Sequence, residues 1–164
     1  MDDAGPASII LKLFLLFILI LINAFFAMSE IAIISLNDAK MEKMAEDGDK
    51  KAKQVLKLTK NSSNFLSTIQ IGVTLAGFLT SAVAAQNFAV MLTDALAKTS
   101  VVKVIPVGAI SVISTILITL IMSYFSLVLG ELAPKKFAMQ KSEKISFAVT
   151  PILLGSSMIT KPFV

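Results

Sequence analysis

The sequence predicts an all-α membrane protein with three membrane-spanning helices. Of its 164 residues, 55% are hydrophobic and 16% are charged, whereas soluble domains carry roughly 25% charged residues. The mean hydropathy is +0.83. The charged residues are clustered, so that three long stretches are almost free of charge. An ionisable side chain near the bilayer centre costs about 2.5–3.5 kcal/mol, and these stretches are therefore the predicted spans.

The predicted spans are residues 9–28, 65–85 and 105–129. The first contains only Lys12, near its outer end, and the other two contain no charged residue. At about 1.5 Å per residue, each is long enough to cross a hydrocarbon core of roughly 30 Å. A cleaved signal peptide is a poorer interpretation of the first stretch, because the chain starts with the acidic Met1-Asp2-Asp3.

A fourth apolar stretch, residues 145–159, is shorter and contains Pro151. As a helix it would be about 22 Å long, which is less than the hydrocarbon thickness. We expect a juxtamembrane or re-entrant helix here, and a fourth span is the alternative.

The connector between the first two spans, residues 38–60, is charged, but its apolar residues recur at helical spacing. Gly48 is expected to divide it into two short helices. Four lysines on one stripe suit anionic lipid headgroups, and a simply solvated face is the alternative; they are Lys50, Lys53, Lys57 and Lys60.

The distribution of lysines predicts the orientation in the membrane. Only Lys98 and Lys103 lie between the second and third spans, whereas the other two connecting regions are rich in lysine. The first connector has Lys40, Lys43, Lys50, Lys51, Lys53, Lys57 and Lys60, and Lys135, Lys136, Lys141, Lys144 and Lys161 follow the third span. Because cytoplasmic loops carry the excess of lysine, we expect the N-terminus outside and the C-terminus in the cytosol.

Polar residues follow one face of each predicted span. The second span has Ser67, Gln70, Thr74, Gly77 and Ser81, and the third has Ser111, Thr115, Thr119 and Ser123, with Ser126 and Gly130 nearby. In the first span, Asn23, Ala27 and Glu30 share a face near the inner end. Such faces turn toward protein or a hydrated cavity. Helix packing and an ion pathway are both compatible with them.

The composition restricts the chemistry. The chain has no Cys, His, Trp or Arg, which removes thiolate nucleophiles, imidazole bases and Cys/His zinc sites. The remaining metal ligands are oxygens, which suit Mg²⁺, Ca²⁺ or Na⁺. A net charge of +4, interspersed with acids, does not indicate nucleic-acid binding. We expect no enzymatic activity, because no nucleophile and base are in evident register.

The third span ends in Gly130-Glu131-Leu132-Ala133-Pro134-Lys135-Lys136. We expect Pro134 to end the regular helix and to push Ala133 toward extended geometry, which would free the carbonyls around Val128 to Gly130. Free carbonyls beside Glu131 would form a cation site. A stop signal followed by cytosolic lysines is the alternative.

Two of these segments resemble the transmembrane domain of the CorC/CNNM family, also called HlyC/CorC or hemolysin C-like proteins. They are Asn23-Ala24-Phe25-Phe26-Ala27-Met28-Ser29-Glu30-Ile31-Ala32 and Gly130-Glu131-Leu132-Ala133-Pro134-Lys135. Residues 68–77, Thr-Ile-Gln-Ile-Gly-Val-Thr-Leu-Ala-Gly, resemble its hemolysin-annotated bacterial branch. The resemblance covers essentially the whole chain.

The resemblance implies a homodimeric bundle in the plasma (inner) membrane, with three spans per subunit and juxtamembrane helices on the cytosolic side. Cytosolic CBS domains normally follow this domain, and none is present in residues 1–164. The implied function is Mg²⁺ transport, usually efflux and proposed to be coupled to Na⁺. Mg²⁺ would be the transported ion rather than a cofactor, and membrane lipids and a second copy would be the partners.

The sequence differs from the family at the ligand positions. The span-one Ser of the family is replaced by Ala27, and the span-two Asn pair aligns with Val73 and Gly77. The candidate cation-binding residues are therefore Ser29, Gln70, Thr74 and Gly130. Asn23, Glu30 and Glu131 are the candidate electrostatic or gating residues.

Two functions remain open on the sequence. One is a cation transporter, and the other is a membrane anchor and dimerisation module for cytosolic regulatory domains. A hydrated, acid-lined cavity would favour the transporter, and a dry interface would favour the anchor.

Overall fold

The computed structural model describes residues 6–60 and 62–160, and within these ranges the chain forms helices and no strand. Among these residues, three helical stretches are long and apolar enough to span a membrane: Ala7–Ile34, Ser63–Ala97 and Val107–Gln140. The predicted all-α fold with three spans is confirmed.

The second and third spans are longer than the predicted stretches 65–85 and 105–129, because each continues through a π-helical turn. The second consists of α4 (Ser62–Ala84), η1 (Ala85–Ala89) and α5 (Val90–Ala97), and the third of α6 (Val107–Leu127), η3 (Val128–Leu132) and α7 (Ala133–Gln140). The 3₁₀ turn η2 (Ser100–Lys103) lies between them. At about 1.5 Å per residue, these helices exceed a hydrocarbon core of roughly 30 Å.

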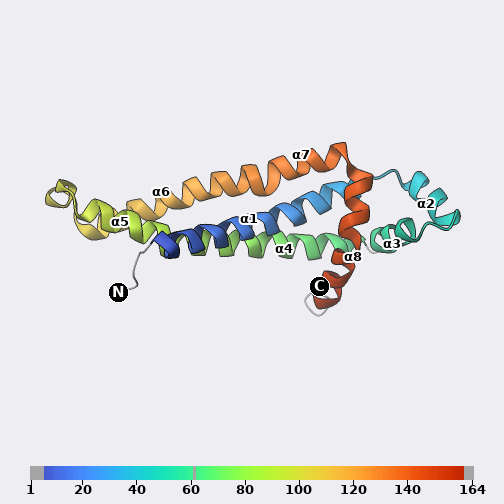
Figure 1. The fold of residues 1–164 in the computed structure, drawn as a ribbon, viewed down its shortest axis with the longest axis horizontal. Coiled ribbons are helices and arrows are strands. Elements are labelled where there is room, and N and C mark those ends of the chain that lie inside the picture. Colours follow the sequence, from blue (N-terminus) through green and yellow to red (C-terminus); the bar gives the residue numbers. More distant parts are fainter. Residues whose placement is uncertain (1–5, 61, 161–164) are drawn as a thin grey trace.

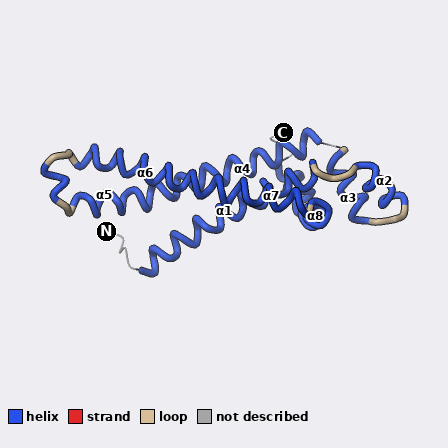
Figure 2. Tube along the Cα trace, turned by 90° about the horizontal axis from the view of Figure 1, so that it is seen from above, coloured by secondary structure: helices blue, strands red, loops and turns tan. Residues whose placement is uncertain are grey.

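The three spans run along the long axis of the molecule (Figure 1). The first span is α1 (Pro6–Ile34), which packs along α4 and, in its second half, against η3 and α7. Figure 2 shows the N-terminal half of α1 diverging from α4 and α6. The close approach of α1 to α4 depends on Gly72, because a Cβ there would lie 2.6 Å from Cε2 of Phe26.

The last helix, α8 (Ser142–Thr160), runs across the end of the bundle and not along it, in both views (Figures 1 and 2). It contains the predicted stretch 145–159, and it is not one of the three candidate spans. Pro151 lies inside this helix. Lys161, counted above among the lysines after the third span, lies outside the described residues.

The first connector folds as two short helices, α2 (Asp38–Glu46) and α3 (Lys50–Thr59). Gly48 divides them as predicted, with φ +99° in the left-handed region that favours glycine. Each helix begins at a side-chain cap: Asn37 accepts from the amide of Lys40, and Asp49 accepts from the amides of Lys51 and Ala52.

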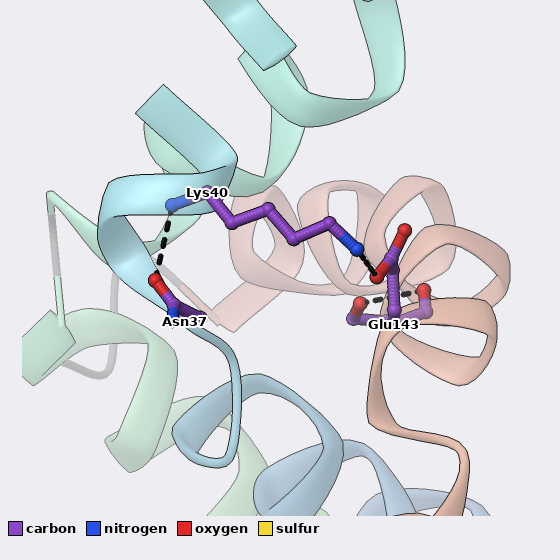
Figure 3. A network of polar contacts seen from close by, with 4 residues as sticks. Asn37, Lys40 and Glu143 are labelled. Carbon is purple, nitrogen blue, oxygen red and sulfur yellow. Dashed lines mark hydrogen bonds and ion pairs between the residues drawn. The ribbon is translucent and has the colours of Figure 1, made fainter. Parts of the chain in front are cut away.

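An ion pair links this connector to α8. Asn37 caps α2, and Lys40 of the same turn donates to the Glu143 carboxylate at the start of α8 (Figure 3). Both side chains are exposed, and such pairs contribute at most about 1 kcal/mol. Burial therefore does more than this ion pair to hold the connector in place.

The main hydrophobic core lies where five helices meet at this end of the bundle. Its residues come from α1, α3, α4, α7 and α8; they are Ala32, Ile33, Leu58, Phe65, Ile69, Ala138, Ile145, Val149 and Leu153. Elsewhere the spans expose large apolar side chains, such as Ile116 and Leu120. An exposed apolar surface of this kind is expected on helices that face lipid.

Candidate cation site

An open cavity of about 360 Å³, lined by both polar and apolar side chains, lies between the three spans. Its lining side chains come from α1, α4, α6 and η3; they are Asn23, Val73, Thr74, Gly77, Phe78, Ser81, Ser123, Ser126, Leu127 and Glu131. Hydroxyl, amide and carboxylate oxygens therefore converge on one space. These are the ligand types that hard cations prefer.

The cavity lies deep along the second span. At about 1.5 Å per residue, Thr74 is roughly 16 Å along the helix from Ser63, near the middle of a hydrocarbon core of roughly 30 Å. Gly77 leaves the cavity open on this side, because nothing lies within 4 Å of the position that its Cβ would occupy.

Asn23 is the most constrained polar group of the cavity. Its side chain is 5% exposed, and its Oδ1 has no hydrogen-bond partner among the described residues. The amide packs against Gly130, where a Cβ would lie 2.8 Å from Asn23 Nδ2. Glycine at 130 therefore allows the Asn23 amide to reach the backbone of η3. A buried amide oxygen without a partner is a ready ligand for a cation.

The prediction that Pro134 ends the third helix is wrong. The chain instead forms the π-helical turn η3, closed by a hydrogen bond from the amide of Ala133 to the carbonyl of Val128, and α7 follows directly. Ala133 is helical, with φ −66° and ψ −46°. The wider turn accommodates the proline ring, and Pro134 then occupies the first turn of α7, where a missing N–H is tolerated. Single π-turns inside helices occur frequently at functional sites.

Charges cluster at the η3 end of the cavity. Lys135 Nζ lies 2.9 Å from Glu131 Oε1 and 3.3 Å from Glu30 Oε2. One ammonium thus bridges a carboxylate that lines the cavity and a carboxylate of α1. The three side chains are about one-third exposed or less, so water also reaches them.

The structure brings together only part of the predicted residue set. Thr74, Asn23 and Glu131 line the cavity, and Gly130 is buried behind Asn23. Glu30 is linked to Glu131 of the cavity by the Lys135 ammonium, which pairs with both carboxylates. The residues lining this cavity do not include the other two candidate ligands: Gln70 is exposed, and Ser29 is fully buried with its hydroxyl donating to the Phe25 carbonyl at 2.6 Å.

Sequence reasoning does not select four polar residues of the candidate site. The lysine distribution identifies Lys135 only as a cytosolic lysine, although its position four residues after Glu131 allows an i, i+4 ion pair. Ser81, Ser123 and Ser126 were assigned to polar faces but not to a common cavity. Ser111 and Thr115, on the same face of the third span, are exposed instead.

Val73 and Gly77, the two positions where the family resemblance expects Asn, also line the cavity. Ala27, at the position of the expected Ser, is fully buried. One cavity is therefore lined both by the second-span positions where Asn is expected and by the polar residues Asn23, Thr74 and Glu131.

Comparison with known proteins finds relatives that match most of the chain. UPF0053 protein sll0260 from Synechocystis sp. is 39% identical over 160 residues, which are 96% of this chain and 34% of that protein. UPF0053 protein YugS from Bacillus subtilis is 30% identical over 95% of this chain and 35% of its own length. A polyamine export protein from Haemophilus influenzae is 28% identical over 89% of this chain and 33% of its own length.

The chain spans about a third of the length of these curated relatives. Residues 14–164 match the family described as the cyclin M transmembrane N-terminal domain, CNNM. This match covers the first span from residue 14 onward, the other two spans, the cavity, the π-turn η3 and α8. The chain therefore belongs to the cyclin M (CNNM) transmembrane domain family.

Proposed function

We propose that this chain is the cation-translocating membrane domain of a transporter and that its cavity holds the cation during transport. The observation that carries the proposal is the cavity between the three spans, which is lined by Asn23, Thr74 and Glu131. The buried Oδ1 of Asn23, which has no hydrogen-bond partner among the described residues, supports it. A packing interface for a membrane anchor would be drier and would leave fewer polar atoms without partners.

Mg²⁺ is the first candidate for the transported ion, with efflux and coupling to Na⁺ as part of the proposal. Six waters at roughly 30 Å³ each need roughly 180 Å³, and the cavity offers about 360 Å³. A largely hydrated Mg²⁺ therefore fits. Thr74 and Asn23 would replace only some of its waters. We therefore expect Mg²⁺ to bind more weakly than at a site that has two Asn ligands, or the site to prefer Na⁺.

Flux into liposomes tests the transport proposal. We expect reconstituted protein to move Mg²⁺ across the membrane, measured with an entrapped Mg²⁺-sensitive dye. Thr74→Val keeps shape and removes the hydroxyl, and it should raise the half-saturating Mg²⁺ concentration several-fold. Thr115→Val is the matched control, because Thr115 is an exposed Thr outside the cavity.

Glu131→Gln gives a second variant in the same assay. It keeps size and removes the charge at the cavity, so flux should fall while expression and thermal stability are retained. Flux no greater than in protein-free liposomes, for wild type under both Mg²⁺ and Na⁺ gradients, would favour the membrane anchor instead.

A polyamine is the second candidate substrate. Two relatives are named polyamine export proteins, and the Lys135 side chain places a primary ammonium against Glu131 and Glu30. The same carboxylates can bind the ammonium of a diffusible amine. Spermidine should then be transported and should compete with Mg²⁺. Uptake of labelled spermidine without any effect of Mg²⁺ would identify the amine as the substrate.

We also propose that the chain lies in the plasma membrane as a homodimer, within a larger protein that carries cytosolic CBS domains. The relatives' greater length supports the larger protein. Cross-linking of the reconstituted protein would test the dimer.

A further inference from the structure

A second cavity, of about 410 Å³, lies on the lysine-rich face of α3 and is separate from the cation site. Three lysines line it together with Ala45 of α2 and Leu56; they are Lys53, Lys57 and Lys60. Because they follow at spacings of four and three residues, they share one face of the helix. The structure thus narrows the predicted stripe of four lysines to three that face a common space.

No acidic residue neutralises this face from within α3. Residues 50–60 contain five lysines and no Asp or Glu. The ion pairs formed by the described part of the chain use Lys40 and Lys135, and none uses Lys53, Lys57 or Lys60. The cavity therefore presents three positive charges without a fixed counterion.

The fold holds this cavity beside the start of the second candidate span. The opposite face of α3 is buried through Ala52, Val55 and Leu58, and Leu58 joins the core that contains α8. Ser63, the first residue of a candidate span, comes three residues after Lys60 in the sequence. A segment so close to the start of a span is expected in the headgroup layer, which is roughly 5–7 Å thick on each side of the hydrocarbon core.

We propose that the cavity between α2 and α3 binds the phosphate headgroup of an anionic phospholipid. Lysine ammonium groups bind phosphate as point charges, and each lysine close to an anionic membrane surface strengthens binding roughly fivefold. A lipid in the adjacent leaflet is already at the height of the cavity, whereas a soluble anion is not concentrated there. This proposal does not depend on what the cation site transports.

Native mass spectrometry of the full chain in detergent tests the proposal. Phosphatidylglycerol is titrated against phosphatidylcholine, and we expect the anionic lipid to bind at least tenfold more tightly. The variant Lys53→Gln/Lys57→Gln/Lys60→Gln should lose roughly tenfold or more of this affinity. The control Lys43→Gln/Lys50→Gln/Lys51→Gln loses the same charge from the same connector but outside the cavity, and it should change affinity less than threefold.

Three results would overturn the proposal. Equal losses in the two triple variants would indicate diffuse attraction to charge. Equal affinities for the two lipids would exclude headgroup recognition. Displacement of the lipid by inorganic phosphate at equal concentration would indicate a site for a soluble anion. The single variant Lys57→Gln, with an expected loss of roughly fivefold, provides the same comparison if the triple variant does not fold.

Discussion

In the proposed transporter, Asn23 serves cation binding at a cost in stability. A buried polar atom without a partner costs about 1–3 kcal/mol, and Asn23 Oδ1 is such an atom among the described residues. Replacement by a similarly shaped apolar side chain removes this cost.

We therefore expect Asn23→Leu to keep or raise the thermal unfolding temperature and to lower cation flux at least tenfold. Circular dichroism measures unfolding, and the liposome assay measures flux. If the variant unfolds at a lower temperature and loses flux in proportion to the folded fraction, Asn23 is a structural residue.

Gly130 belongs to the same contact. In Gly130→Ala, the new Cβ would lie 2.8 Å from Asn23 Nδ2, so the amide must shift away from η3. We expect a loss of about 1–3 kcal/mol in stability and a several-fold fall in flux. Gly155→Ala is the control, because its Cβ would meet nothing within 4 Å. Equal effects of the two variants would show that helix propensity, and not the Asn23 contact, determines the result.

The residue pattern could identify part of the site but not its boundary. Thr74 follows from the polar face of the second span. Gln70 lies on that face as well, but one turn earlier, about 6 Å from Thr74 along the helix axis. Its side chain is exposed there. Ser29 satisfies its hydroxyl within its own helix, and a buried Ser of this kind needs no ligand. Neither property is visible in the order of residues.

At the scale of helices, the third span shows what the sequence leaves undecided at Pro134. The sequence shows that a regular helix cannot pass this residue without adjustment, but it does not show whether the helix stops or widens. Packing decides: α7 continues because Ala138 joins the core with α1 and α8. The π-turn η3 then remains at the level of the cavity, with Glu131 on its lining.

The bridge made by Lys135 couples η3 and α7 to α1. Lys135→Gln removes the ammonium from Glu131 and should raise the apparent affinity for Mg²⁺ several-fold, because a competing cation is gone. The stability loss should stay near or below about 1 kcal/mol, since the side chains are partly solvated. Concentration-dependent flux and thermal unfolding measure the two effects.

Lys136→Gln is the matched control for this prediction. It removes the same charge from the next residue, whose side chain is exposed. Equal changes of Mg²⁺ affinity in both variants would mean that Lys135 acts only through net charge, and a fall in affinity would mean that it positions Glu131.

For the whole molecule, the three spans could be predicted because placing a charge in the hydrocarbon core is costly however the helices pack against one another. The course of α8 across the bundle and the continuation through η1 and η3 could not, because they depend on contacts between distant helices. The lysine asymmetry predicts a third property, the orientation in the membrane. It depends on which side of the membrane each connector occupies and not on contacts within the chain.

The orientation is therefore tested by chemistry from each side. The chain has no Cys, so Lys51→Cys and Thr99→Cys each introduce a single thiol at an exposed position. The lysine-rich connector should remain in the cytosol. We expect a membrane-impermeant maleimide to label Thr99→Cys in intact cells and to label Lys51→Cys only after the membrane is opened. Labelling of Lys51→Cys in intact cells would reverse the orientation, and it would place the lysine cavity of α3 on the outer leaflet.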